Sequence, residues 1–217
     1  MHDFRFFIEK RKPKILCLGA HPDDIEIGCG GTVLKIISDL PEAQFYWVVF
    51  SGDDNRAKEA KQSANVFLKG VESKTIIVND FKESYFPFFG VNIKDFFEKL
   101  KQKFSPDLVF THCGNDAHQD HRLLSHLTWN TFRNNFILEY EIHKYDGDLG
   151  NPNLYSYLNE AFVQKKVKTI CKVFQSQNRK PWFSEDTFKS ILRIRGVESN
   201  SPNGYAEAFY CRKIVFR

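Results

Sequence analysis

Two stretches of the sequence concentrate histidine and carboxylate side chains. The first is the run Ala20-His21-Pro22-Asp23-Asp24, and the second holds five more such residues, His112, Asp116, His118, Asp120 and His121. Imidazole and carboxylate groups are common ligands of zinc and similar divalent ions, and a carboxylate that binds no metal can act as a base. Side chains this polar are poor core material, so the two stretches indicate a site for metal-assisted acid–base chemistry.

The elements that would position these stretches alternate between strand and helix patterns. Short apolar or β-branched runs predict strands, and apolar residues spaced three to four apart predict helices. The predicted strands cover residues 15–19, 44–50, 74–78 and 107–111, and the predicted helices cover residues 32–40, 56–64, 93–104 and 122–132. This alternation predicts an α/β fold, a Rossmann-like doubly wound, mostly parallel sheet with helices on both faces.

The alternation weakens after residue 135, where we expect a strand at 136–142, a helix at 157–175 and a final strand at 206–216. No linker or internal repeat interrupts the chain, which favours a single domain over residues 1–217. The run Gly28-Cys29-Gly30-Gly31 lacks the lysine of a phosphate-binding loop. Its glycines are instead expected to let the backbone approach the site closely.

The two polar stretches follow the first and the fourth predicted strands. In the common doubly wound orders these strands are neighbours or nearly so, and ligands bind beyond their carboxyl ends where the strand order reverses. We therefore expect the two stretches to form one site, although they lie far apart in the chain.

The spacing within each stretch supports a metal site. His21 and Asp24 are three residues apart, as are His118 and His121, so a helical turn would place each pair on one face. A catalytic zinc ion takes three protein ligands, and two imidazoles with one carboxylate suit it. Taken singly, each histidine could be a surface residue and each aspartate a helix cap. Their joint occurrence in two stretches favours a site for metal-assisted acid–base chemistry.

Composition restricts the remaining function classes. The net charge is +4, and no basic run is interleaved with aromatic residues, so we expect no nucleic-acid partner. The five cysteines are scattered without a CxxC pair, which is typical of a reducing compartment. Residues 1–10 lack the apolar run of a signal peptide, and no stretch has the length of a transmembrane segment. We therefore expect a cytoplasmic protein.

With these residues, the chain resembles the PIG-L/LmbE-like family of zinc-dependent N-deacetylases. Residues 20–24 match the family motif AHPDD, residues 28–32 match GCGGT, and residues 118–121 match HxDH. Weaker matches are Arg56 with Glu59, and the tail at residues 204–209. Many members carry glutamate directly after the two aspartates, whereas this chain has Ile25 there and Glu26 one place later. The resemblance implies an LmbE-like three-layer sandwich and one Zn²⁺ ion per chain.

The resemblance also implies a role for each motif residue. His21, Asp24 and His121 would hold the zinc, Asp23 would be the general base, and His118 would stabilise the oxyanion as an imidazolium. Asp120 would orient His118 or His121, and Asp116 could do the same. Histidines outside the motifs are not expected to be ligands, namely His112, His126 and His143.

The family acts on N-acetyl groups of amino sugars, so the implied substrate is a small molecule or glycoconjugate carrying an N-acetylglucosaminyl-type group. Three residues in predicted loops are candidates for substrate binding, namely Arg56, Asp80 and Tyr145. Arg56 could grip a substrate oxyanion or pair with Glu59 at a helix start. A plain surface role is an alternative for Asp80 and Tyr145.

Two other functions fit the same residues. The histidines and aspartates could hold two metal ions in a phosphoesterase, which metal stoichiometry would reveal. Alternatively, the chain could be a non-catalytic α/β domain that binds a sugar or nucleotide without turnover. The complete set of base and oxyanion positions favours the deacetylase.

Overall fold

A computed structural model describes residues 12–214, whose strands form one seven-stranded sheet in the order β3-β2-β1-β4-β5-β7-β6. Its strands are β1 Lys14–Gly19, β2 Gln44–Val49, β3 Lys74–Val78, β4 Leu108–His112, β5 Phe136–Tyr140, β6 Leu154–Tyr157 and β7 Ala206–Tyr210. Strands β1 to β5 pair in parallel, and β7 pairs antiparallel with both β5 and β6. The predicted mostly parallel sheet is confirmed, and β1 lies directly beside β4.

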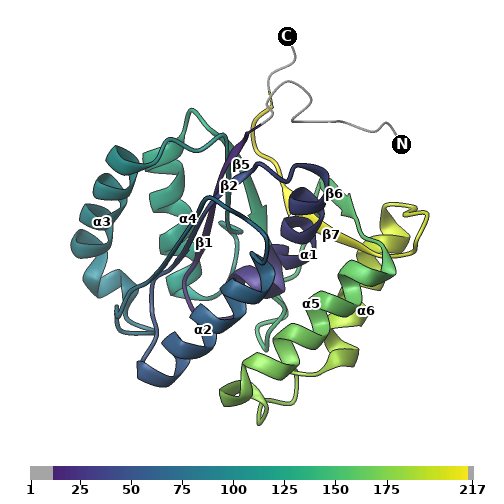
Figure 1. Cartoon of the computed structure of the whole chain (residues 1–217). Helices are drawn as coiled ribbons and strands as arrows, with labels where there is room; N and C mark the ends of the chain where they lie inside the picture. The colour runs from purple at the N-terminus through teal and green to yellow at the C-terminus, as the bar shows by residue number, and fades with distance from the viewer. Residues whose placement is uncertain (1–11, 215–217) are drawn as a thin grey trace.

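The described residues form six α-helices that cover both faces of this sheet, so the sheet and its helices make three layers (Figure 1). They are α1 Asp24–Asp39, α2 Asp54–Phe67, α3 Gly90–Lys103, α4 Gln119–Phe132, α5 Glu160–Val173 and α6 Glu185–Glu198. Helices α3 and α4 cover one face of the sheet, and α1, α2, α5 and α6 lie on the other. Two short 3₁₀ helices are also present, η1 Phe86–Phe89 and η2 Gln175–Gln177. The prediction of helices on both faces is therefore confirmed.

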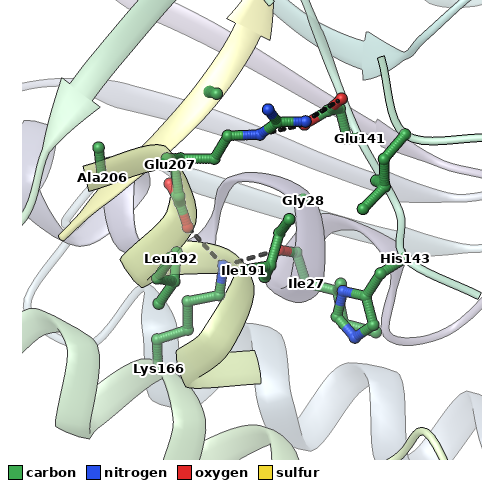
Figure 2. Close-up of a pocket in the computed structure, with 12 residues that line it drawn as sticks. Ile27, Gly28, Glu141, His143, Lys166, Ile191, Leu192, Ala206 and Glu207 are labelled. Carbon is green, nitrogen blue, oxygen red and sulfur yellow. Dashed lines mark hydrogen bonds and ion pairs between the residues drawn. The ribbon is translucent and has the colours of Figure 1, made fainter. Parts of the chain in front are cut away.

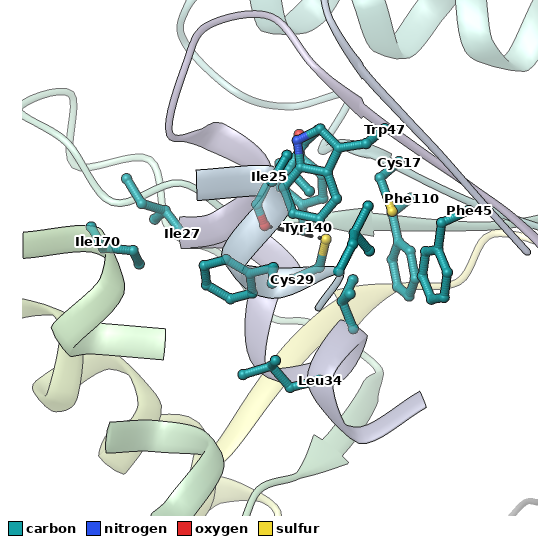
Figure 3. Packing of buried hydrophobic residues seen from close by; sticks show 14 of the residues in the cluster. Cys17, Ile25, Ile27, Cys29, Leu34, Phe45, Trp47, Phe110, Tyr140 and Ile170 are labelled. Atoms are coloured by element: carbon teal, nitrogen blue, oxygen red, sulfur yellow. Dashed lines mark hydrogen bonds between the residues drawn. The ribbon is translucent and has the colours of Figure 1, made fainter. Parts of the chain in front are cut away.

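The strands have apolar side chains on both faces because both faces are covered. In β1, Ile15 and Cys17 belong to the core under α1, α2 and α5, whereas Leu16 and Leu18 belong to the core under α3 and α4. Figure 3 shows part of the first core, where Cys17 of the sheet and Cys29 of α1 lie among aromatic rings. A strand buried on both faces reads as a continuous apolar run, which explains why the sequence pattern identified β1.

Helix α1 begins eight residues earlier than predicted, at Asp24, and runs through the glycine-rich segment. A Cβ on Gly28 would lie 2.1 Å from the Tyr140 ring, and a Cβ on Gly31 would lie 2.5 Å from Leu158 Cδ1. The glycines thus let α1 pack closely against core side chains, and the expectation that they serve backbone approach to the site is wrong. Tertiary packing here outweighs the low helix propensity of glycine.

A buried ion pair supports the middle of α1 (Figure 2). Lys166 Nζ of α5 donates to the Ile27 carbonyl and to Glu207 Oε1 of β7, both at 2.6 Å. Glu207 also accepts the backbone N–H groups of Gly31 at 2.7 Å and Thr32 at 2.6 Å. In a regular helix the Gly31 amide would donate to the Ile27 carbonyl. The two side chains therefore satisfy backbone groups in the middle of the helix that carries Asp24 at its start.

The sequence pattern missed strand β6 and helix α6, and it also missed the two short 3₁₀ helices. The helix predicted over 157–175 is α5, which begins only at Glu160, because Tyr157 ends the edge strand β6. The final strand ends at Tyr210 rather than 216, and the prediction for residues 215–216 lies outside the described residues. The signal-peptide prediction for residues 1–10 also lies outside them. Within residues 12–214, no helix has the length and apolarity that crossing a bilayer requires, and all five cysteines are free thiols.

Candidate active site

The first polar stretch forms the turn between β1 and α1. Asp23 is the N-cap residue of α1, yet its side chain makes no capping hydrogen bond, and its φ of 96° lies in the left-handed region. Residues other than glycine adopt this conformation at a cost of about 1–3 kcal/mol, and they do so mostly at functional sites. Asp23 is 5% exposed. Because its carboxylate caps no backbone N–H of α1, it is available for another role.

The second stretch joins β4 to α4 and lies against the first because β1 and β4 are neighbours. His118 is the N-cap of α4, and His121 lies in its first turn. The ring centroids of His21 and His121 are 5.1 Å apart, and those of His21 and His118 are 4.8 Å apart. The predicted convergence of the two stretches into one cluster is what the structure shows.

Three ligand atoms of this cluster face one another. His21 Nδ1 lies 3.1 Å from His121 Nε2, and Asp24 Oδ2 lies 3.4 Å and 3.5 Å from these two nitrogens. Metal–ligand bonds of about 2.0–2.1 Å in tetrahedral geometry set neighbouring ligands roughly 3.3 Å apart. The triangle formed by His21, Asp24 and His121 therefore fits a zinc ion.

The outward-facing ring nitrogens of both histidines contact carboxylates. His21 Nε2 is 3.0 Å from Asp120 Oδ2, and His121 Nδ1 is 2.9 Å from Asp116 Oδ2. A carboxylate at one ring nitrogen draws the proton there and leaves a lone pair on the other nitrogen, as in carboxylate–histidine–metal arrangements. In the neutral form of each ring, the remaining lone pair would point into the triangle, where a metal ion needs it.

Two overlapping groups of possible ligands occur in the cluster, one of His21, His118 and His121, and one of Asp24, His112 and His121. Within each group the ligand atoms lie within 4.8 Å of one another. The groups share His121, and Asp24 of the second contacts His21 of the first. They therefore describe one centre.

Burial and charge set the protonation of the aspartates. Burial disfavours the ionised form of Asp24, but the charges of His121, His112 and His21 outweigh burial and hold its pKa well below the usual range. Burial raises the pKa of Asp23 to about 7, against the lowering effect of Arg56. Burial opposes protonation of His21, yet Asp24 and Asp120 raise its pKa to about 10 without a metal ion, so an ion that binds Nδ1 would have to displace this proton. One carboxylate is thus an anion suited to a cation, and the other is poised to take a proton near neutral pH.

His118 is held at the start of α4 by a hydrogen bond to its ring. Its Nδ1 accepts a hydrogen bond from the Asp120 backbone N–H at 3.2 Å, so the ring proton lies on Nε2. Burial, followed by the charge of His21, lowers the pKa of His118. Both observations favour the neutral imidazole with an Nε2–H donor in the metal-free protein, and the oxyanion role of His118 stays a prediction.

Asp120 differs from the expectation, because its carboxylate contacts His21 rather than His118 or His121. It further accepts the backbone N–H groups of Ser84 at 2.6 Å and Phe86 at 3.0 Å, from the loop after β3. This loop is thereby attached to the cluster of histidines and aspartates. Asp116 behaves as expected, since it contacts His121 Nδ1.

His112 belongs to the cluster, as its place in the second stretch predicts, and it contacts Asp24 and His121 although no ligand role is expected for it. It is fully buried, its ring stacks on His121 at 3.9 Å between centroids, and its Nε2 lies 3.2 Å from Asp24 Oδ2. The Ala20 backbone N–H donates to the same nitrogen at 3.0 Å. Its position at the carboxyl end of β4 was the available signal, since that edge carries the site.

The three candidates for substrate binding lie in different settings. Arg56 contacts Asp23 Oδ1 at 3.5 Å, the Pro22 carbonyl at 2.8 Å and Glu83 Oε2 at 2.6 Å. It does not pair with Glu59, which instead accepts from Ser176 in η2. Asp80 is exposed, and Tyr145 is 72% exposed. Arg56 is thus the candidate that the fold brings into contact with Asp23 and the cluster of histidines and aspartates.

A family model described as PIG-L, GlcNAc-PI de-N-acetylase, matches residues 16–132, which contain both polar stretches. The conserved protein TT1542 from Thermus thermophilus has a similar structure, with TM-score 0.73 and 19% identity over 94% of this chain and 97% of that chain. N,N'-diacetylchitobiose deacetylase from Pyrococcus horikoshii is similar with TM-score 0.69 and 25% identity over 94% and 84% of the two chains.

The same fold occurs in the 4-carboxy-2-hydroxymuconate hydratase GalB from Pseudomonas putida. That structure is similar with TM-score 0.72 and 15% identity, over 94% of this chain and 98% of that chain. A shared fold therefore does not determine the chemistry, and the assignment of function depends on the residues of the site.

Proposed function

The chain belongs to the PIG-L family, and from this we propose that it is a zinc-dependent N-deacetylase that hydrolyses the N-acetyl amide of an amino sugar. The observation that carries the proposal is the triangle of His21 Nδ1, His121 Nε2 and Asp24 Oδ2, with edges of 3.1, 3.4 and 3.5 Å. These three residues would hold the ion. When bound, zinc supplies a Lewis acid that polarises the acetyl carbonyl and acidifies water.

Asp23 is the proposed general base. Asp23 adjoins Asp24 in the chain but belongs to neither group of possible ligands, and its carboxylate makes no capping hydrogen bond to α1. A base with a pKa of about 7 can take the proton from the attacking water and return it to the leaving amine at neutral pH. Arg56, 3.5 Å from Asp23 Oδ1, would keep this carboxylate in place.

His118 is the proposed oxyanion stabiliser. Its Nδ1 accepts from the Asp120 backbone, which leaves Nε2–H as the donor. A neutral imidazole fixed in this way can donate to the carbonyl oxygen as negative charge develops there. Removal of one such donor typically lowers the rate by about 10²–10³.

The proposed substrate class is an N-acetylglucosaminyl-type glycoside or glycoconjugate. Support comes from the description of the family as GlcNAc-PI de-N-acetylase and from the similarity to the Pyrococcus horikoshii deacetylase. The free thiols fit the reducing cytoplasm that the cysteine spacing predicted.

The test measures acetate release and metal content together. The protein loaded with zinc is assayed on N,N'-diacetylchitobiose and on N-acetylglucosamine glycosides. We expect Asp23→Asn to lower kcat by about 10²–10⁴ at unchanged zinc content, and Asp24→Ala and His121→Ala to lose the zinc itself.

The control variant is Asp95→Asn, whose exposed side chain lies on α3 outside the cluster. Full deacetylase activity in Asp23→Asn would refute the assignment of the base. Two ions per chain together with phosphatase activity would favour the phosphoesterase instead, and tight sugar binding without turnover would favour the binding domain.

A further inference from the structure

Lys144 lies in the loop after β5, outside every motif that identified the site. We propose that Lys144 is a positioning residue of the metal centre, which acts by fixing the Asp116 carboxylate against His121. This inference rests on the proposed function, because it takes His121 to be a metal ligand. It assigns the loop after β5 a part in metal binding rather than in sugar binding alone.

The contacts form a chain from Lys144 to the ligand. Lys144 Nζ lies 3.0 Å from Asp116 Oδ1, and Asp116 Oδ2 lies 2.9 Å from His121 Nδ1. The His118 backbone N–H also donates to Asp116 Oδ1, at 2.8 Å. One carboxylate is therefore held by Lys144 on one side while it orients the ligand histidine on the other.

Lys144 is fully committed to the protein. An ammonium group has three N–H donors, and Lys144 Nζ has three acceptors, Asp116 Oδ1 at 3.0 Å, Asp148 Oδ2 at 2.5 Å and the Ile142 carbonyl at 3.3 Å. Its side chain is only 10% exposed. No donor is left for a sugar hydroxyl, so the residue acts on the protein and not on the substrate.

The charge of Lys144 separates two anions. Because Nζ contacts both carboxylates, Asp116 Oδ1 and Asp148 Oδ2 can be no more than 5.5 Å apart, the sum of 3.0 and 2.5 Å. The side chains of Asp116 and Asp148 are 3% and 13% exposed, so water screens them poorly. Without the cation, repulsion would push Asp116 away, and His121 would lose the partner that fixes its ring.

The experiment measures the affinity for zinc by competition with a chromophoric chelator, on the full chain. Removal of a residue that orients a metal ligand typically costs 10–100-fold in affinity. We expect Lys144→Met to weaken zinc binding by that factor. We expect Asp148→Asn to stay within about threefold of the wild type, because it keeps the cation on Asp116.

A double-mutant cycle tests whether Lys144 acts through Asp116. If it does, Lys144→Met has no further effect on zinc affinity in an Asp116→Asn background. The matched control is Lys189→Met, which removes a lysine from an exposed i,i+4 pair with Glu185. Thermal unfolding of the metal-free proteins reports any loss of stability separately from zinc affinity.

Three results would overturn the inference. The first is an unchanged zinc affinity in Lys144→Met, and the second is an equal loss in Asp148→Asn, which would indicate a merely structural loop contact. The third is additivity of Lys144→Met and Asp116→Asn, which would show that Lys144 does not act through Asp116. Failure of the wild-type protein to bind one zinc per chain would instead refute the proposed function.

Discussion

Replacement of Lys166 by methionine should destabilise the protein strongly. Lys166 and Glu207 have side chains that are each 2% exposed and lie 2.6 Å apart, and Lys166 also holds the Ile27 carbonyl at 2.6 Å. Methionine preserves the apolar stem but leaves the Glu207 carboxylate buried without its cation. Breaking a buried pair from one side typically costs about 3–5 kcal/mol, because the remaining charge is uncompensated.

The expected size of the effect can be converted to a melting temperature. For a chain of 150–250 residues, each 1 kcal/mol shifts Tm by about 2–4 °C, so Lys166→Met should lower Tm by roughly 6–20 °C. The free energy of unfolding is measured by urea titration of metal-free protein, so that the metal centre does not contribute. The control Lys189→Met, on an exposed ion pair, should show no measurable change.

The double variant Lys166→Met with Glu207→Gln tests the reason for this loss. Removal of both charges together leaves no buried ion, so the double variant should lose less stability than the sum of the two single variants. The side-chain carbonyl of the introduced glutamine could still accept one of the two α1 amides that Glu207 accepts. Strict additivity, or a loss below about 1 kcal/mol in Lys166→Met, would refute the argument that the pair satisfies the middle of α1.

Two further predictions concern the core. Burial, together with the charges of Lys166 and Lys144, lowers the pKa of His143 from 6.5 to about 4, so the unfolded chain binds a proton that the folded protein does not between these values. The free energy of unfolding should therefore fall by about 3 kcal/mol as the pH drops from 6.5 to 4. Urea titrations across this pH range should show a weaker fall for His143→Phe than for the wild type. The same pH dependence in both proteins would contradict this prediction. Gly28→Ala should lower the free energy of unfolding by about 1–3 kcal/mol or more, because its Cβ would lie 2.1 Å from the buried Tyr140 ring. The control is Gly90→Ala, because no atom lies within 4 Å of a Cβ at Gly90; Gly147 is unsuitable because its φ is +62°. Equal effects of Gly28→Ala and Gly90→Ala would show that packing is not the cause.

The sequence determined the features that depend on local pattern. Alternating apolar runs and helical periodicity identified β1 to β5 and the helices between them, and topology rules then placed the loops after β1 and β4 together. The motif residues His21, Asp24 and His121 needed no structure to be named. Each of these inferences uses information carried by neighbouring residues or by the order of elements.

The tertiary structure decided which side chains meet. That Asp120 contacts His21 rather than its neighbours in sequence, and that His112 stacks on His121, follows from the packing of α4 against the edge of β1 and β4. The run of α1 through three glycines was likewise hidden, because its amides are satisfied by Glu207, a residue far away in the chain. Local propensity cannot report such partners, since hydrogen bonds between distant residues exist only once the chain has folded.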